Sequence, residues 1–383
     1  MRFLKLFFGL IGLAILVSNI WTISRWNESR GVYDDICYLR QAHLFQRFGI
    51  DGLNTDVARD DDHYLATKLK EIGYPKWNEP AQAPCHSLQP SVQKRVLTPP
   101  PGTGFVLAIF PSGFQVIPLY ISANLIVFGF VLFALFYART RADILLSGIF
   151  GCIALYLMIN PTKASYSLAP STVVCVLAAF FTAKFPLAET ATRRFLLAVS
   201  VGFLIGLSVN FRIANLFLAG GFGIYLLGLF ILKRSFETLL QGLLFGAACL
   251  VGMTPTLLAN AINAGSPLAT TYDGPDVGAP TFSLPVIWQY LTDMQCVLIV
   301  LAIGWMALIF YGRRESAIRQ TALFTAMNLV INLTFFMSHA IFTPYYLLPI
   351  AVLSLWSLLF ATLVQPTTEV HGSGQSKRSV VST

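Results

Sequence analysis

The basic segment Met1-Arg2-Phe3-Leu4-Lys5 stands directly before an apolar run, LFFGLIGLAILVSNIWTI, that covers residues 6–23. A run of this length can cross the hydrocarbon core of a bilayer, and it shows no clear small-x-small cleavage site. We therefore expect a retained signal anchor and not a cleaved signal peptide. Because cytoplasmic segments are enriched in Lys and Arg, Arg2 and Lys5 indicate a cytoplasmic N-terminus.

The composition of the whole chain agrees with this beginning. Of its 383 residues, 55% are hydrophobic and 11% are charged, and the mean hydropathy is +0.67. Soluble domains carry about 25% charged residues, so we predict an all-α integral membrane protein with about ten transmembrane helices. The predicted spans are 6–23, 116–138, 143–159, 172–188, 195–210, 215–232, 238–260, 294–311, 319–338 and 344–363.

The net charge of +8 comes from short basic clusters between apolar runs. Arg193-Arg194, Lys233-Arg234 and Arg313-Arg314 all fall on the side that the first span makes cytoplasmic. Such clusters set membrane topology, so we expect no nucleic-acid partner. We interpret the chain as a bacterial inner-membrane protein with both termini in the cytoplasm, and an endoplasmic reticulum location stays open.

These patterns divide the chain into a signal-anchor helix (1–24), a large external loop (25–114), a polytopic domain (115–364) and a disordered cytoplasmic tail (365–383). In the loop, the stretch from Val32 to Phe48 predicts an amphipathic helix that lies along the membrane surface.

Residues 104–114 are apolar but too short to span the membrane, and Pro111-Ser112-Gly113 interrupts them. If they crossed, Arg139 and Arg141 would lie outside, against the positive-inside rule. We therefore predict a re-entrant or interfacial segment.

Two of the six cysteines, Cys37 and Cys85, lie in the external loop, and none of the six shows the spacing of a metal site. In an oxidising compartment Cys37 and Cys85 could form a disulfide, and the sequence leaves open whether they are bonded. The adjacent Asp34 and Asp35 also lie there, close to the first span. Carboxylates at a membrane boundary are costly, which favours a functional role.

Several short motifs follow one another in a recognisable order. They are Asp34-Asp35-Ile36-Cys37-Tyr38, then Pro99-Pro100-Pro101, then Gly206-Leu207-Ser208-Val209-Asn210-Phe211-Arg212, and then Asn263-Ala264-Gly265-Ser266-Pro267-Leu268-Ala269-Thr270-Thr271-Tyr272. This order resembles the GT-C superfamily of polyprenyl-phosphate-sugar-dependent glycosyltransferases, which includes protein O-mannosyltransferases and the aminoarabinose transferase of lipid A. Many members carry an arginine before the final Tyr-Leu-Leu-Pro. Here that stretch is Pro344-Tyr345-Tyr346-Leu347-Leu348-Pro349, and the arginine is missing.

The resemblance implies an inverting transfer of a sugar from a polyprenyl-phosphate donor to a lipid, glycan or protein hydroxyl, at an active site that faces the periplasm. Asp34 would be the general base that takes the acceptor proton. Asp35 would support it, or would be a solvated charge at a helix N-terminus.

The donor phosphate needs cations. Arg212 is the first candidate, with Lys94 and Arg95 as alternatives. Snorkelling to the headgroups is the competing interpretation for Arg212, and a solvated or lipid-facing basic pair is the competing interpretation for Lys94 and Arg95.

Other residues extend the hypothesis. Tyr38, Tyr272, His339 and Tyr345 are candidates for a substrate groove, although interfacial aromatic belts and simple packing explain such residues as well. The sequence identifies no cofactor with certainty. A divalent cation stays open, because the run Asp60-Asp61-Asp62-His63 contains metal-ligating types but is also typical of a solvated loop.

Two other functional classes compete with glycosyl transfer. One is a transporter or flippase of lipid-linked or small polar substrates, and the other is a catalytically inactive membrane scaffold. Transporters usually place ionisable groups near the middle of several spans. Here the predicted spans are almost free of charge, with Lys184 and Arg212 near their ends, which favours the enzyme.

Overall fold

The computed structural model describes residues 1–28, 33–79, 82–158, 165–273, 278–312, 315–339 and 341–364. Within these ranges the description does not include the side chains of Tyr33, Asp34, Leu157, Met158, Met294 and Pro344. The predicted disordered tail, 365–383, lies outside the described residues.

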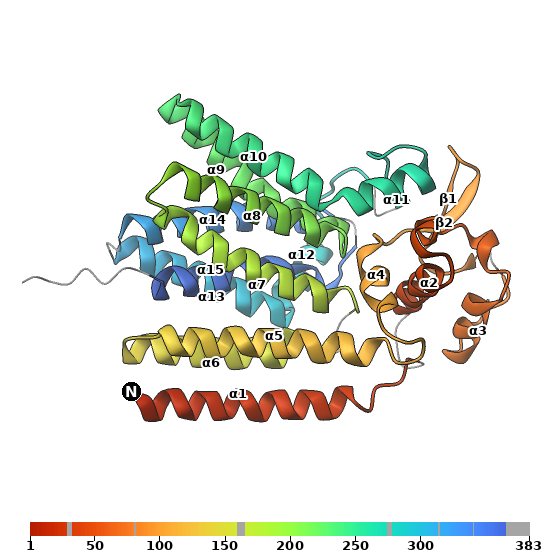
Figure 1. Ribbon diagram of the computed structural model, residues 1–383, viewed down its shortest axis with the longest axis horizontal. Coiled ribbons are helices and arrows are strands. Elements are labelled where there is room, and N and C mark those ends of the chain that lie inside the picture. Colours follow the sequence, from red (N-terminus) through yellow and green to blue (C-terminus); the bar gives the residue numbers. More distant parts are fainter. Residues whose placement is uncertain are drawn as a thin grey trace, which may run out of the picture.

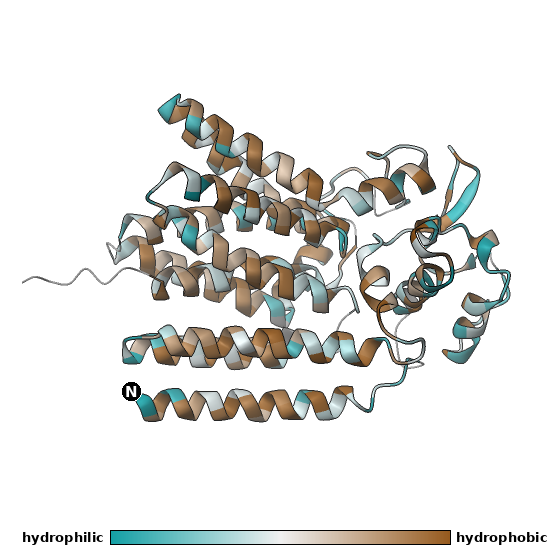
Figure 2. Ribbon diagram, in the orientation of Figure 1, coloured by the Kyte–Doolittle hydropathy of each residue, from teal (hydrophilic) through white to brown (hydrophobic). Residues whose placement is uncertain are grey.

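Long helices that lie side by side make up most of the molecule (Figure 1). They are α1 (Arg2–Ile23), α5 (Val116–Tyr137), α6 (Arg141–Met158), α7 (Leu168–Lys184), α8 (Ala191–Val209), α9 (Leu218–Lys233), α10 (Phe236–Gly252), α13 (Met294–Tyr311), α14 (Ser316–Met337) and α15 (Leu348–Leu363). We call these helices the bundle. Most of their residues are hydrophobic (Figure 2), and α15 is buried along almost its whole length.

Within the part of the chain that the structure describes, seven helices are long and apolar enough to cross a membrane. The number rises to nine if two bent pairs each count as one span: α10 with α11 (Thr254–Ala264), bent by 55°, and α12 (Leu284–Thr292) with α13, bent by 78°. This agrees with the predicted all-α membrane fold. The prediction of about ten spans also counted 143–159, where α6 lies, and α6 is not among these helices.

The predicted external loop folds into a small unit at one end of the bundle, opposite the N-terminus (Figure 1). It contains α2 (Tyr33–Phe48), the short helices η2 (Gly49–Leu53) and η3 (Val57–Arg59), α3 (Tyr64–Glu71), the strands β1 (His86–Gln89) and β2 (Lys94–Leu97), and α4 (Gly102–Ala108). The strands pair antiparallel, with His86 opposite Leu97. We call residues 33–108 the head, and the two ends of the bundle the head end and the far end.

Helix α2 has nearly the predicted limits but a different environment. Every residue from 35 to 42 is buried, so this part of the helix is the core of the head and lacks the exposed face of an amphipathic surface helix. Helix α4 covers part of it. A Cβ atom on Gly104 would stand 2.6 Å from Cγ of Gln41, and Gln46 Nε2 donates to the carbonyl of Phe110 (2.6 Å). With only seven residues, α4 does not span the membrane, as predicted.

Helices α8 and α10 approach each other closely through small residues. A Cβ atom on Gly206 would lie 2.1 Å from the carbonyl oxygen of Cys249, and one on Gly202 would lie 2.3 Å from that of Phe245. Gly202 and Gly206 therefore act as a small-xxx-small contact that lets two backbones meet. This contact fixes the position of the end of α8, which leads directly to Arg212.

Candidate functional site

A cavity of about 630 Å³ lies between the head and the adjoining ends of the bundle helices. Small-molecule sites commonly have volumes of about 300–1,000 Å³. The lining comes from segments far apart in the sequence. It includes five sequence-predicted candidates: Tyr38, Arg212, Tyr272, His339 and Tyr345.

Arg212 is the most unusual group in this cavity. Its side chain is 8% exposed, and its guanidinium carbon lies 4.7 Å from the ring centre of Tyr345 and 4.6 Å from that of Tyr346. The two rings attract the cation through their negative faces. Among the described residues, however, no group accepts a hydrogen bond from Nη1, although this atom is buried. A buried guanidinium with an unused donor is suited to bind an anion.

Asn210 holds this arginine in place from the end of α8. Its Nδ2 donates to the carbonyl of Gly252 (2.7 Å), and its Oδ1 accepts from the backbone and the hydroxyl of Thr256 (3.0 and 2.8 Å). Its own carbonyl accepts from the backbone nitrogen of Gly102 (2.7 Å). One amide side chain and its carbonyl thus join α8, the bend between α10 and α11, and the start of α4.

Position 102 must be glycine for this contact, because a Cβ atom there would stand 2.6 Å from the Asn210 carbonyl oxygen. The Pro-Pro-Pro turn just before it therefore leads the chain directly onto the end of α8.

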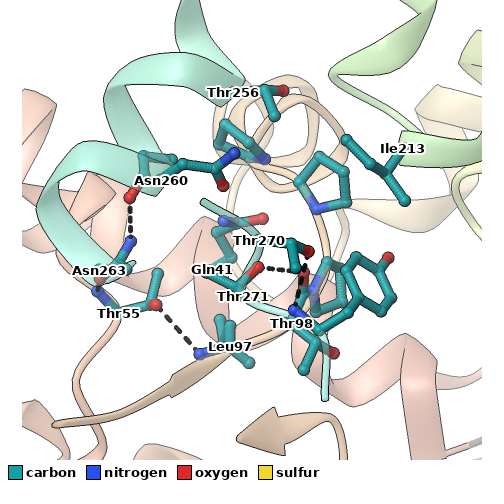
Figure 3. A pocket seen from close by; sticks show the side chains of 15 residues that line it. Gln41, Thr55, Leu97, Thr98, Ile213, Thr256, Asn260, Asn263, Thr270 and Thr271 are labelled. Carbon is teal, nitrogen blue, oxygen red and sulfur yellow. Dashed lines mark hydrogen bonds between the residues drawn. The ribbon is translucent and has the colours of Figure 1, made fainter. Parts of the chain in front are cut away.

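The loop after α11 is fixed to the head by hydrogen bonds (Figure 3). Asn263 Oδ1 accepts from the backbone nitrogen of Thr55 (3.0 Å), and Thr55 Oγ1 accepts from that of Leu97 (3.1 Å). Thr271 Oγ1 donates to the carbonyl of Thr98 (2.8 Å). The small pocket between these residues, about 10 Å³, has room for about one water molecule.

Gly265 ends α11 at φ +81°, a conformation that favours glycine. Asn263 and Gly265 of the quoted motif therefore shape and attach the loop, and Tyr272 follows at the cavity wall.

The two adjacent acids of α2 have different places in the structure. Asp35 is 1% exposed, its Oδ1 accepts from the backbone nitrogen of Tyr166 (3.0 Å), and it is not among the lining residues. It therefore anchors the segment before α7, where Ser165 and Ser167 line the cavity. The side chain of Asp34 lies outside the described part of the chain.

Lys94 and Arg95 are not brought to the cavity. They lie on β2, where Lys94 pairs with Gln89 and Arg95 with Leu88, and neither lines the cavity. Their partners on the opposite strand could not be predicted from the sequence, because strand register depends on the whole head. By contrast, Cys37 and Cys85 are joined as a disulfide, which links α2 to the start of the hairpin.

His86 lines the cavity and was not a sequence-predicted candidate. Its Nε2 lies 2.6 Å from Arg40 Nη1 and its Nδ1 lies 2.7 Å from the carbonyl of Pro84. Because a guanidinium only donates, Nε2 must accept, and Nδ1 carries the proton. Burial, together with the nearby charge of Arg40, lowers the pKa of His86 from 6.5 to about 3. His86 is therefore neutral, and it contributes a polar edge without a charge.

The acidic run Asp60-Asp61-Asp62 is used within the head. Asp60 accepts from the backbone nitrogen of Leu65 (2.8 Å) near the start of α3, Asp61 pairs with Arg47, and Asp62 lies 2.6 Å from His43 Nε2. In the described part of the chain, no three Asp, Glu, His or Cys side chains are arranged to share a metal ion.

No protein-family model, curated protein or solved structure matches this chain.

Proposed function

We propose that the protein is a membrane glycosyltransferase that moves a sugar from a polyprenyl phosphate to an acceptor hydroxyl in the cavity at the head end. The observation that carries the proposal is Arg212, whose buried Nη1 has no acceptor among the described residues. A phosphate oxygen would supply that acceptor. Its negative charge grows as the bond to the sugar breaks, so the arginine would stabilise the transition state more than the bound donor.

The place of the proposed base on α2 supports this proposal. Position 34 comes one helical turn before Tyr38, and residues four apart lie on the same face of a helix. Tyr38 lines the cavity. In the proposal, Asp34 takes the proton of the acceptor hydroxyl as that oxygen attacks the sugar carbon, and the lipid phosphate leaves toward Arg212. Attack opposite the leaving group inverts the configuration at that carbon.

The proposed orientation follows from the basic clusters at the far end. Arg194 and Lys233 lie there, and a cytoplasmic far end satisfies the positive-inside rule. The head would then face the periplasm of a bacterial cell, where its disulfide would persist. A periplasmic active site also suits a donor that is carried on a membrane lipid.

Mass spectrometry of lipids from cells with and without the protein first identifies the polyprenyl-phosphate-linked sugars. The test is then the transfer of such a sugar by the purified protein in vesicles. We expect Asp34→Asn to lower transfer at least about 100-fold, the lower range for loss of a general base. Arg212→Gln should also lower transfer and should weaken donor binding. Asp143→Asn, at the start of α6, is a matched control with unchanged transfer.

Each variant is accepted only if its thermal unfolding midpoint stays near that of the unmodified protein. Wild-type rates for both folded variants would refute the assignment. Uptake of the substrate into vesicles without any covalent transfer would favour a transporter.

A further inference from the structure

A second cavity, of about 420 Å³, opens at the far end of the bundle. It lies between the short helix η5 (Phe185–Leu187), the start of α8, the end of α9, the start of α10 and the start of α14. Its polar lining consists mainly of Arg194, Lys233, Glu237, Gln241, Tyr225 and Gln320. No residue of the proposed glycosyl-transfer site contributes to it.

The charges of this cavity favour an anion. Arg194 and Lys233 face one carboxylate, Glu237, and Lys233 forms no ion pair within the described residues. The Arg194–Glu237 pair is long, at 3.5 Å, and its side chains are 39% and 41% exposed. Such an exposed pair contributes about 0–1 kcal/mol. Nη1 of Arg194 can therefore exchange Glu237 for a ligand at little cost, while Nε keeps its hydrogen bond to the carbonyl of Ala188 (2.9 Å).

The back wall of the cavity offers hydrogen-bonding groups. Gln241 is only 3% exposed, and its Nε2 donates to Glu237 Oε1 (3.1 Å). Tyr225 donates its hydroxyl to Gln320 Oε1 (3.1 Å). These groups suit the hydroxyl and ester oxygens of a polar headgroup rather than a bare ion.

The approach to the cavity is apolar. Leu232, next to Lys233, is 83% exposed, and Phe236, at the start of α10, is 76% exposed. In a membrane protein these side chains face acyl chains, while a neighbouring lysine or arginine reaches the headgroup layer.

We infer that this cavity binds the headgroup of an anionic phospholipid, with Arg194 and Lys233 holding the phosphate and the acyl chains lying against Leu232 and Phe236. Basic pockets between transmembrane helices are known to suit such headgroups. The inference depends on the membrane fold and not on the proposed transfer reaction.

The test compares two double variants that remove the same total charge from adjacent positions. Arg194→Gln with Lys233→Gln removes the cavity cations, whereas Arg193→Gln with Arg234→Gln removes their exposed neighbours, which do not line the cavity. Binding of phosphatidylglycerol to the full-length protein in phosphatidylcholine nanodiscs is measured by native mass spectrometry. With about a fivefold contribution per cation, the first variant should bind roughly 25-fold more weakly and the second about as well as the unmodified protein.

Glu237→Gln should have the opposite sign and bind phosphatidylglycerol more tightly, because it removes the competing carboxylate. Equal losses in the two double variants, or equal binding of added phosphatidylcholine, would overturn the inference in favour of a diffuse surface effect. Competition by inorganic phosphate as effective as that by phosphatidylglycerol would overturn it in favour of a soluble ligand. If the first double variant does not fold, the single variants Arg194→Gln and Lys233→Gln are compared with Arg193→Gln and Arg234→Gln in the same assay.

Discussion

Helix α8 carries an arginine near each end, and the two are held in opposite ways. Arg194, in the first turn, is 39% exposed and pairs with Glu237 at the far end. Arg212, just beyond the last turn, is 8% exposed, lies against two tyrosine rings and leaves Nη1 without an acceptor in the described part of the molecule.

This difference in exposure and partners determines what each end of the bundle can bind. An exposed pair is exchangeable, so the far end can hold a headgroup that comes and goes with the surrounding lipid. A buried guanidinium with an unsatisfied donor costs free energy in the empty protein, and a ligand that accepts from this donor would offset the cost. The head end therefore has the properties of a specific site.

We expect the largest loss of stability from a substitution at the contact between α8 and α10, close to the head end. In Gly206→Ala, the new Cβ atom would stand 2.1 Å from the Cys249 carbonyl, which forces the helices apart. Overpacking of this kind costs about 2–3 kcal/mol. We expect a clear fall in the thermal unfolding midpoint and weaker donor binding.

The matched control is Gly246→Ala on α10, where the added atom meets nothing within 4 Å. This change should leave stability the same or raise it slightly, because alanine favours helix more than glycine does. An equal loss from both substitutions would show that α8 is not held by the small-residue contact.

A second effect concerns the pH dependence of stability, which we expect to be specific to the head. The folded head keeps His86 neutral, with its pKa lowered to about 3, whereas the unfolded chain takes up a proton near 6.5. The unfolded state therefore binds more protons between these values, and stability falls as the pH drops below 6.5. The loss is about 1.4 kcal/mol per pH unit, or about 2 kcal/mol at pH 5.

Protease protection of the head, measured from pH 8 to pH 5, should show this slope. His86→Gln keeps an acceptor for Arg40 but does not titrate, so its slope should be flatter. An unchanged slope in His86→Gln would assign the pH dependence to other groups.

The sequence predicted the coarse plan of the site because topology is strongly constrained in a membrane. Short loops and the positive-inside rule bring the ends of alternate spans together, so Tyr38, Arg212, Tyr272, His339 and Tyr345 were expected on one face and line one cavity. The sequence placed Cys37 and Cys85 in the same loop and left their bonding open, and the structure pairs them.

What the sequence did not reveal depends on the internal packing of the head. Lys94 and Arg95 lie opposite Gln89 and Leu88 on the paired strand, and strand register is a property of the whole unit. Asp35 looks like Asp34 in sequence, yet burial makes it an acceptor for the backbone of Tyr166. His86 is placed at the cavity by the hairpin and by Arg40, and no local pattern marks it.

The smallest change in stability is expected when each of the two arginines is replaced by methionine, and it tests the comparison between them most directly. Arg212→Met replaces a buried, partly unsatisfied cation with an apolar side chain that can contact the same tyrosine rings. It loses the cation–π attraction but removes the desolvation cost, so we expect the ligand-free protein to gain about 1 kcal/mol while losing donor binding. Arg194→Met removes an exposed pair and the hydrogen bond from Nε to the carbonyl of Ala188, so we expect a loss of about 1 kcal/mol. Thermal unfolding without ligand measures the stability of both variants. For Arg212→Met, the gain in stability should accompany the loss of donor binding. If Arg212→Met destabilises the ligand-free protein, Arg212 serves the fold and is not held ready for an anion.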